Sequence, residues 1–211
     1  MLAFGPRLSG ENGFLPRSGI VWVAGRGVRV DERHPWAIEA ELGVPEGDPG
    51  ERPPNVAALA GIDGNEDGTG AWKPLGRAAG AVRTGLNWCR IAAGAEGAPP
   101  HCHSAEEELF VVLEGEGILE LWAPPDPAEP RQQAPRETHR LRPGHVVSRP
   151  PGTRVPHTIR AAPDAPVTYL AYGTRDPSDV CWYPRSNKVF LRGVGMIARL
   201  EPLEYSDGEP G

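Results

Sequence analysis

The sequence predicts an all-β fold made of short strands joined by many turns. Glycine (27 residues) and proline (25 residues) occur throughout the chain, and runs rich in valine, isoleucine and leucine lie between them. From about residue 81 onward these runs are short and closely spaced, and most have a glycine or proline nearby. This spacing is typical of a β-sandwich or β-barrel. We therefore expect little helix.

The elements are expected in the following order. Residues 19–34 should form a hairpin, residues 36–42 a short helical turn, and residues 44–54 and 63–70 loops. Strands are expected at residues 86–92, 108–113, 118–122, 138–141, 145–148, 157–160 and 167–172. The proline-rich residues 123–137 should form a long hairpin tip, and residues 188–191 and 196–200 further strands. This predicts an N-terminal extension (1–79), a barrel (80–175) and a C-terminal extension that packs on the barrel (176–211).

Composition excludes several partners. The formal charge of −6 and the pI near 5.6 argue against a nucleic-acid partner, which usually needs a basic face. No apolar stretch approaches the length of a membrane span, and residues 1–19 lack the pattern of a signal peptide. The three cysteines are an odd number without metal-type spacing, so we expect a cytoplasmic protein.

Two histidines and a glutamate have the spacing of a metal site. Residues two apart on a strand share a face, so His101 and His103 should point the same way and Cys102 the opposite way. Glu108 follows a four-residue turn and opens the next strand, which can run back beside the first. Downstream, a Pro-Pro-Gly turn precedes His157, which would supply a third imidazole. Imidazole and carboxylate ligands suit first-row divalent ions.

These stretches resemble the two sequence motifs of the cupin superfamily. The first motif matches at His101, His103, Glu108 and Gly115, with Ala95 in place of its leading glycine. The second matches at Gly144, Pro150 and Gly152, and His157 follows after four residues where the family usually has two. The resemblance covers roughly residues 80–175. It implies a cupin jelly-roll β-barrel that holds one divalent metal ion (Fe, Mn, Zn or Ni) through His101, His103, Glu108 and His157.

The other acidic and imidazole side chains nearby are expected to face solvent. Glu108 stands at the motif distance before Gly115, so Glu106 and Glu107 are expected to be exposed turn residues. His139 should lie on an exposed strand face and His145 in a solvated turn.

The resemblance implies a metal-dependent protein that acts on a small oxygen-donor molecule inside the barrel. Fe(II) would favour a dioxygenase, whereas Mn²⁺, Zn²⁺ or Ni²⁺ acting as a Lewis acid would give an isomerase, decarboxylase or hydrolase. A non-catalytic binding or sensing cupin is the alternative, and one fold hosts all of these functions. The N-terminal hairpin is too small to be stable alone. We expect it to pair with the barrel of its own chain or of a two-fold partner, which predicts a homodimer.

Overall fold

The computed structural model describes residues 57–124, 126, 134–201, 203 and 205–209, and the backbone of three strands near the N-terminus. The chain divides into two compact units, residues 1–52 and 53–211. In the first unit, β1 (Gly13–Leu15), β2 (Ile20–Val23) and β3 (Arg26–Arg29) form an antiparallel sheet in that order. The expected hairpin is therefore present. The helical turn expected at 36–42 and the loop at 44–54 lie outside the described residues.

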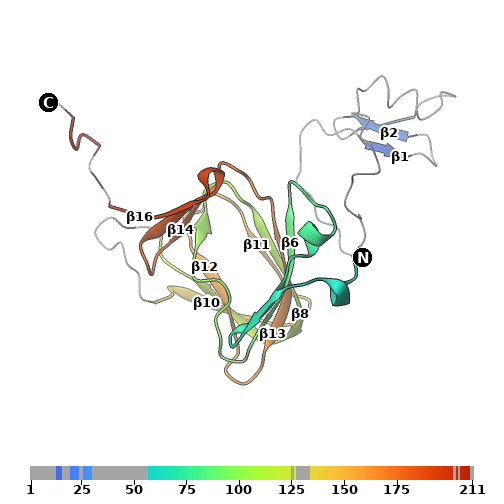
Figure 1. The fold of residues 1–211 in the computed structure, drawn as a ribbon, viewed down its shortest axis with the longest axis horizontal. Helices are drawn as coiled ribbons and strands as arrows, with labels where there is room; N and C mark the ends of the chain where they lie inside the picture. Colours follow the sequence, from blue (N-terminus) through green and yellow to red (C-terminus); the bar gives the residue numbers. More distant parts are fainter. Residues whose placement is uncertain are drawn as a thin grey trace. The chain divides into compact units, whose positions relative to one another are not determined.

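The part of the second unit that the structure describes contains three antiparallel sheets (Figure 1). The largest has the order β11-β8-β13-β6-β5-β4, and a three-stranded sheet has the order β10-β9-β12. A four-stranded sheet, β16-β15-β14-β7, contains the last strands of the chain. The strands are β4 (Asn65–Asp67), β5 (Gly70–Lys73), β6 (Gly85–Ile91), β7 (Cys102–His103), β8 (Glu108–Gly115), β9 (Gly117–Leu121), β10 (Glu137–Leu141), β11 (Val146–Arg149), β12 (His157–Ala161), β13 (Val167–Gly173), β14 (Val180–Tyr183), β15 (Lys188–Leu191) and β16 (Met196–Arg199).

Helical structure in the described residues of the second unit is confined to three short elements. They are η2 (Leu59–Gly61), α2 (Leu75–Ala78) and η3 (Arg192–Val194). Within the described residues, no helix has the length and apolar character needed to cross a membrane.

The main hydrophobic core lies between the six-stranded and three-stranded sheets. On β8, Phe110 and Val112 are two apart and share the face that enters this core. Both sheets contribute to it, through Cys89, Ile91, Phe110, Val112, Leu119, Leu141, Ile159, Ala161, Val167 and Tyr169. The predicted all-β, jelly-roll barrel is confirmed.

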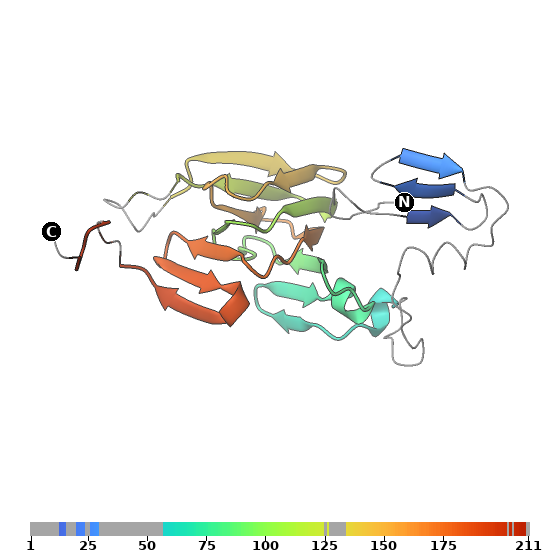
Figure 2. The same ribbon diagram turned by 90° about the horizontal axis from the view of Figure 1, so that it is seen from above.

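The C-terminal strands belong to the same unit as the barrel (Figure 2). β14 pairs with the two-residue strand β7, with Cys181 opposite His103 and Trp182 opposite Cys102. Cys102, Trp182 and Val189 form a second, smaller core cluster on this sheet. The strand that carries His103 is therefore held in place by residues far downstream in the sequence.

Candidate metal centre

Three segments bring the predicted ligands to one place. His101 and His157 face each other across an antiparallel bridge: the His101 amide donates to the His157 carbonyl (3.1 Å), and the His157 amide donates back (2.8 Å). His103 lies on β7, and Glu108 opens β8 after a short turn. This arrangement puts three imidazoles around the start of β8.

The three imidazoles surround one carboxylate oxygen. Glu108 Oε2 lies 3.2 Å from His157 Nε2, 3.5 Å from His103 Nε2 and 3.8 Å from His101 Nε2. The ring of His101 is 5.0 Å from that of His103 and 4.9 Å from that of His157, measured between centroids. All four side chains predicted from the sequence therefore converge.

The ring nitrogens that point away from Glu108 are held by acceptors. His101 Nδ1 lies 2.7 Å from the Pro99 carbonyl oxygen, and His103 Nδ1 lies 2.7 Å from Asp179 Oδ2. A carbonyl and a carboxylate oxygen can only accept, so Nδ1 carries the proton in both rings. The lone pair of each Nε2 is then directed toward Glu108, as metal ligation requires.

Burial and mutual interaction set the charge states of this group. Burial alone would raise the pKa of Glu108, but interaction with His101 and His157 outweighs it and holds the pKa far below its usual range. Burial lowers the pKa of His157 to about 4, so this imidazole is neutral at neutral pH. Burial alone would lower the pKa of His101, but Glu108 and the Pro99 carbonyl oxygen raise it above its ordinary value. A carboxylate beside neutral imidazole is the donor chemistry of a divalent metal site.

Two buried polar atoms in this group support that reading. Within the described part of the chain, Glu108 Oε2 and His157 Nε2 are both buried, and although they lie 3.2 Å apart neither makes a hydrogen bond of acceptable geometry. Leaving a buried polar atom unsatisfied costs roughly 1–3 kcal/mol, so such atoms are rare without an ion or water to satisfy them. The residues present therefore fit a divalent ion of the first transition row.

The cysteines near the group occupy two different sides of β7. Cys102 packs with Trp182 and Val189 in the small core cluster, as strand alternation predicts. Cys181 reaches the site instead: its sulfur and one ring nitrogen each of His101 and His103 all lie within 4.8 Å of one another. Burial raises the pKa of Cys181 to about 12 and keeps it a neutral thiol. Nothing in the local sequence indicated this position, because it depends on the β14–β7 pairing.

Glu106 is a correction to the sequence analysis. It is buried, with 6% of its surface exposed, and its carboxylate forms an ion pair with Arg192. Local sequence could not reveal this pair, since Arg192 follows β15 near the end of the chain. Glu107 is exposed as expected, and its amide donates to the Thr174 hydroxyl.

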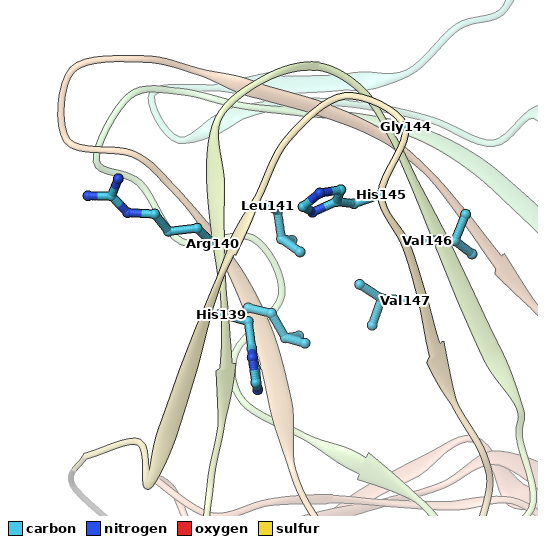
Figure 3. Close-up of a pocket in the computed structure, with 8 residues that line it drawn as sticks. His139, Arg140, Leu141, Gly144, His145, Val146 and Val147 are labelled. Atoms are coloured by element: carbon cyan, nitrogen blue, oxygen red, sulfur yellow. The ribbon is translucent and has the colours of Figure 1, made fainter.

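His139 and His145 lie apart from the four predicted ligands, as expected (Figure 3). Both are exposed and line an open hollow between β10 and β11, together with Leu141 and Val147. His139 Nε2 lies 2.9 Å from Glu137, and His145 Nδ1 accepts from the Arg142 amide. None of the four predicted ligands lines this hollow.

A different pocket reaches Glu108, one of the four predicted ligands. It has a volume of about 550 Å³, and Glu108 forms part of its wall. Three arginines, Arg77, Arg175 and Arg192, also line it. Arg77 and Arg175 are exposed, whereas Arg192 is partly buried by its pairing with Glu106. The pocket thus connects solvent to Glu108 past several cationic side chains.

Comparison with known proteins agrees with this fold. Residues 87–173 match the family model of the cupin domain. A sugar phosphate isomerase from a cupin superfamily of Silicibacter pomeroyi is 24% identical, with a TM-score of 0.55, over 74% of this chain and 95% of that one. A protein from Acidithiobacillus ferrooxidans, assigned as a sugar phosphate isomerase, is 24% identical, with a TM-score of 0.57, over 71% of this chain and 97% of that one. No curated protein sequence matches.

At this level of identity the two solved structures establish a shared fold. The range matched by the family model includes β7, β8 and β12. Residues 87–173 therefore form a domain that matches the cupin family model.

Proposed function

We propose that this protein is a metal-dependent cupin that acts as a Lewis-acid isomerase on a small phosphorylated sugar. The observation that carries the proposal is the convergence of three imidazole Nε2 atoms on Glu108 Oε2, at 3.2, 3.5 and 3.8 Å. His101, His103, Glu108 and His157 would hold one divalent ion. When bound, the ion supplies a Lewis acid that polarises a substrate carbonyl.

The pocket beside Glu108 supports an anionic substrate. Arg77 and Arg175 are exposed on its wall, and a guanidinium binds phosphate through two parallel hydrogen bonds. A phosphorylated sugar has a carbonyl or hydroxyl end for the metal centre and a phosphate end for these arginines. The sugar phosphate isomerase names of the two solved structures agree with this substrate class.

The test is direct assay of metal-loaded protein against aldose and ketose phosphates, followed by nuclear magnetic resonance of the sugar carbons. We expect interconversion of at least one pair, with no reaction of the unphosphorylated sugar. Conversion that needs O₂, or none with any sugar phosphate, would contradict the proposal. Oxygen-dependent turnover with bound iron would point to the dioxygenase instead.

Arginine variants test the substrate class. Arg175→Ala should raise KM for the phosphorylated substrate about tenfold or more with kcat little changed, because a hydrogen bond to a charged group contributes about 1.5–3 kcal/mol. The matched control is Arg140→Ala, which removes an exposed arginine beside the hollow of Figure 3. An equal effect of both substitutions would show that Arg175 does not bind the phosphate of the substrate.

A further inference from the structure

We propose that Asp179 is a positioning residue of the metal centre: it fixes the His103 ring and the turn between His103 and Glu108. The inference rests on the metal site proposed above and adds a residue to it. Asp179 immediately precedes β14 and lies beyond the residues matched by the cupin family model, 87–173. The C-terminal strands would then be part of the site and more than a covering layer.

The side chain of Asp179 has no exposed surface. A buried carboxylate is expensive unless its oxygens are well satisfied. Its Oδ2 lies 2.7 Å from His103 Nδ1, and its Oδ1 accepts from the amides of Ala105 (3.0 Å) and Glu106 (3.2 Å). The same carboxylate thus binds a predicted ligand and the backbone of the turn that follows it.

A carboxylate in this position determines the tautomer of His103. Asp179 Oδ2 accepts a hydrogen bond from the Nδ1–H group, so Nε2 is the nitrogen with the free lone pair, 3.5 Å from Glu108 Oε2. The contact also fixes the rotation of the ring about its attachment to the backbone. Partners of this kind orient ligating imidazoles and increase their basicity.

The turn between the two ligands is fastened at the same point. The Ser104 amide donates to the Val180 carbonyl (3.0 Å), and the Val180 amide donates to the Ser104 hydroxyl (2.7 Å). With the Asp179 contacts, these bonds attach the turn to the start of β14. The spacing between His103 and Glu108 therefore depends on residues 179 and 180.

A second metal site at Asp179 is a less suitable reading. His103, Glu106 and Asp179 do place ligand atoms near one another. Arg192 already supplies a cation to this group: it pairs with Glu106 and lies 3.6 Å from Asp179 Oδ2. In addition, the 2.7 Å contact between His103 Nδ1 and Asp179 is a direct hydrogen bond.

The experiment is titration of the full-length apoprotein with Co²⁺, followed by calorimetry and by the visible spectrum of the bound ion. Asp179→Asn keeps the shape of the side chain and removes its charge. We expect the Co²⁺ affinity to fall about 10- to 100-fold, with a changed spectrum. Asp176→Asn is the matched control, since the partly exposed Asp176 carboxylate accepts only from the Ser178 amide and hydroxyl among the described side-chain hydrogen bonds. This control should bind like the unmodified protein.

The outcomes separate this inference from the metal site itself. If the unmodified protein does not bind Co²⁺, the proposed metal site fails. If it binds and Asp179→Asn shows the same affinity and spectrum, only the positioning role fails, even if the variant unfolds at a lower temperature.

A measurement on the unmodified apoprotein covers the case in which the variant does not fold. Nitrogen-15 resonances of the His103 ring at pH 8 report its tautomer. We expect the proton on Nδ1; a proton on Nε2 would overturn the inference.

Discussion

Three consecutive glutamates, Glu106 to Glu108, have three different environments. Glu107 faces solvent, Glu106 is buried against Arg192, and Glu108 faces the three imidazoles. The chain leaves a turn and enters β8 at this point, so adjacent side chains point in different directions. At the residue scale, the direction of each side chain decides its role.

The Glu106–Arg192 pair predicts a difference between two neighbouring substitutions. Glu106→Gln removes the nearer of two carboxylates that face the mostly buried Arg192, and should lower the free energy of unfolding by about 1–3 kcal/mol. Glu107→Gln changes an exposed side chain and should alter the free energy of unfolding by less than about 0.5 kcal/mol. Urea unfolding of both variants measures this. Equal stabilities would show that the pair contributes nothing.

Elements that contain motif residues or short apolar runs were the most predictable from sequence. β8, β12 and β15 were expected within two residues of their observed ends, because a motif residue or a short apolar run marks each strand and turn residues lie nearby. β14 was not expected, and with it the contributions of Asp179 and Cys181 were missed. Its four residues (Val180–Tyr183) pair with a strand of only two residues, β7, so long-range register and not local pattern defines it.

Two motif glycines should differ in their tolerance of a side chain. Gly115 (φ 76°) and Gly144 (φ 88°) both have the left-handed backbone that costs other residues about 1–2 kcal/mol. At Gly115 an added Cβ would also overlap the Pro166 carbonyl oxygen, whereas at Gly144 no atom of the described residues lies within 4 Å of it. Gly115→Ala should therefore destabilise the fold clearly more than Gly144→Ala. Thermal unfolding checks the order, and a reversed order would contradict the close approach of Gly115 to the Pro166 carbonyl oxygen.

At the scale of the whole molecule, the interior of the barrel unit protects its thiols. Cys89, Cys102 and Cys181 are all buried and unpaired. Burial raises their pKa values to about 12, 11 and 12, respectively. Each folded-state pKa lies well above 8, so at pH 8 all three remain neutral thiols, and the thiolate is the reactive form.

A thiol reagent should therefore label none of the three cysteines in the folded protein at pH 8, and all three after denaturation. Absorbance of the released chromophore over time measures the number labelled. Rapid labelling without denaturant would show that the barrel opens readily or that these strands are wrongly placed.

The motifs allowed the barrel and the convergence of the four residues to be predicted, but not the pocket beside them. Arg77, Arg175 and Arg192 come from three separate segments, and only the folded chain brings them to one wall. Association through the N-terminal hairpin stays a prediction. Light scattering of the full chain would test the expected homodimer.

The most direct test of the central claim is the metal content of protein purified without a histidine tag and loaded with a divalent ion. We expect one ion per chain, and none after His101→Ala or His103→Ala, because a labile ion is lost when one of four ligands is removed. Cys102→Ser should retain the ion, since Cys102 packs in the cluster on the other side of β7. Full occupancy in either histidine variant would contradict the assignment of His101, His103, Glu108 and His157 as the metal ligands.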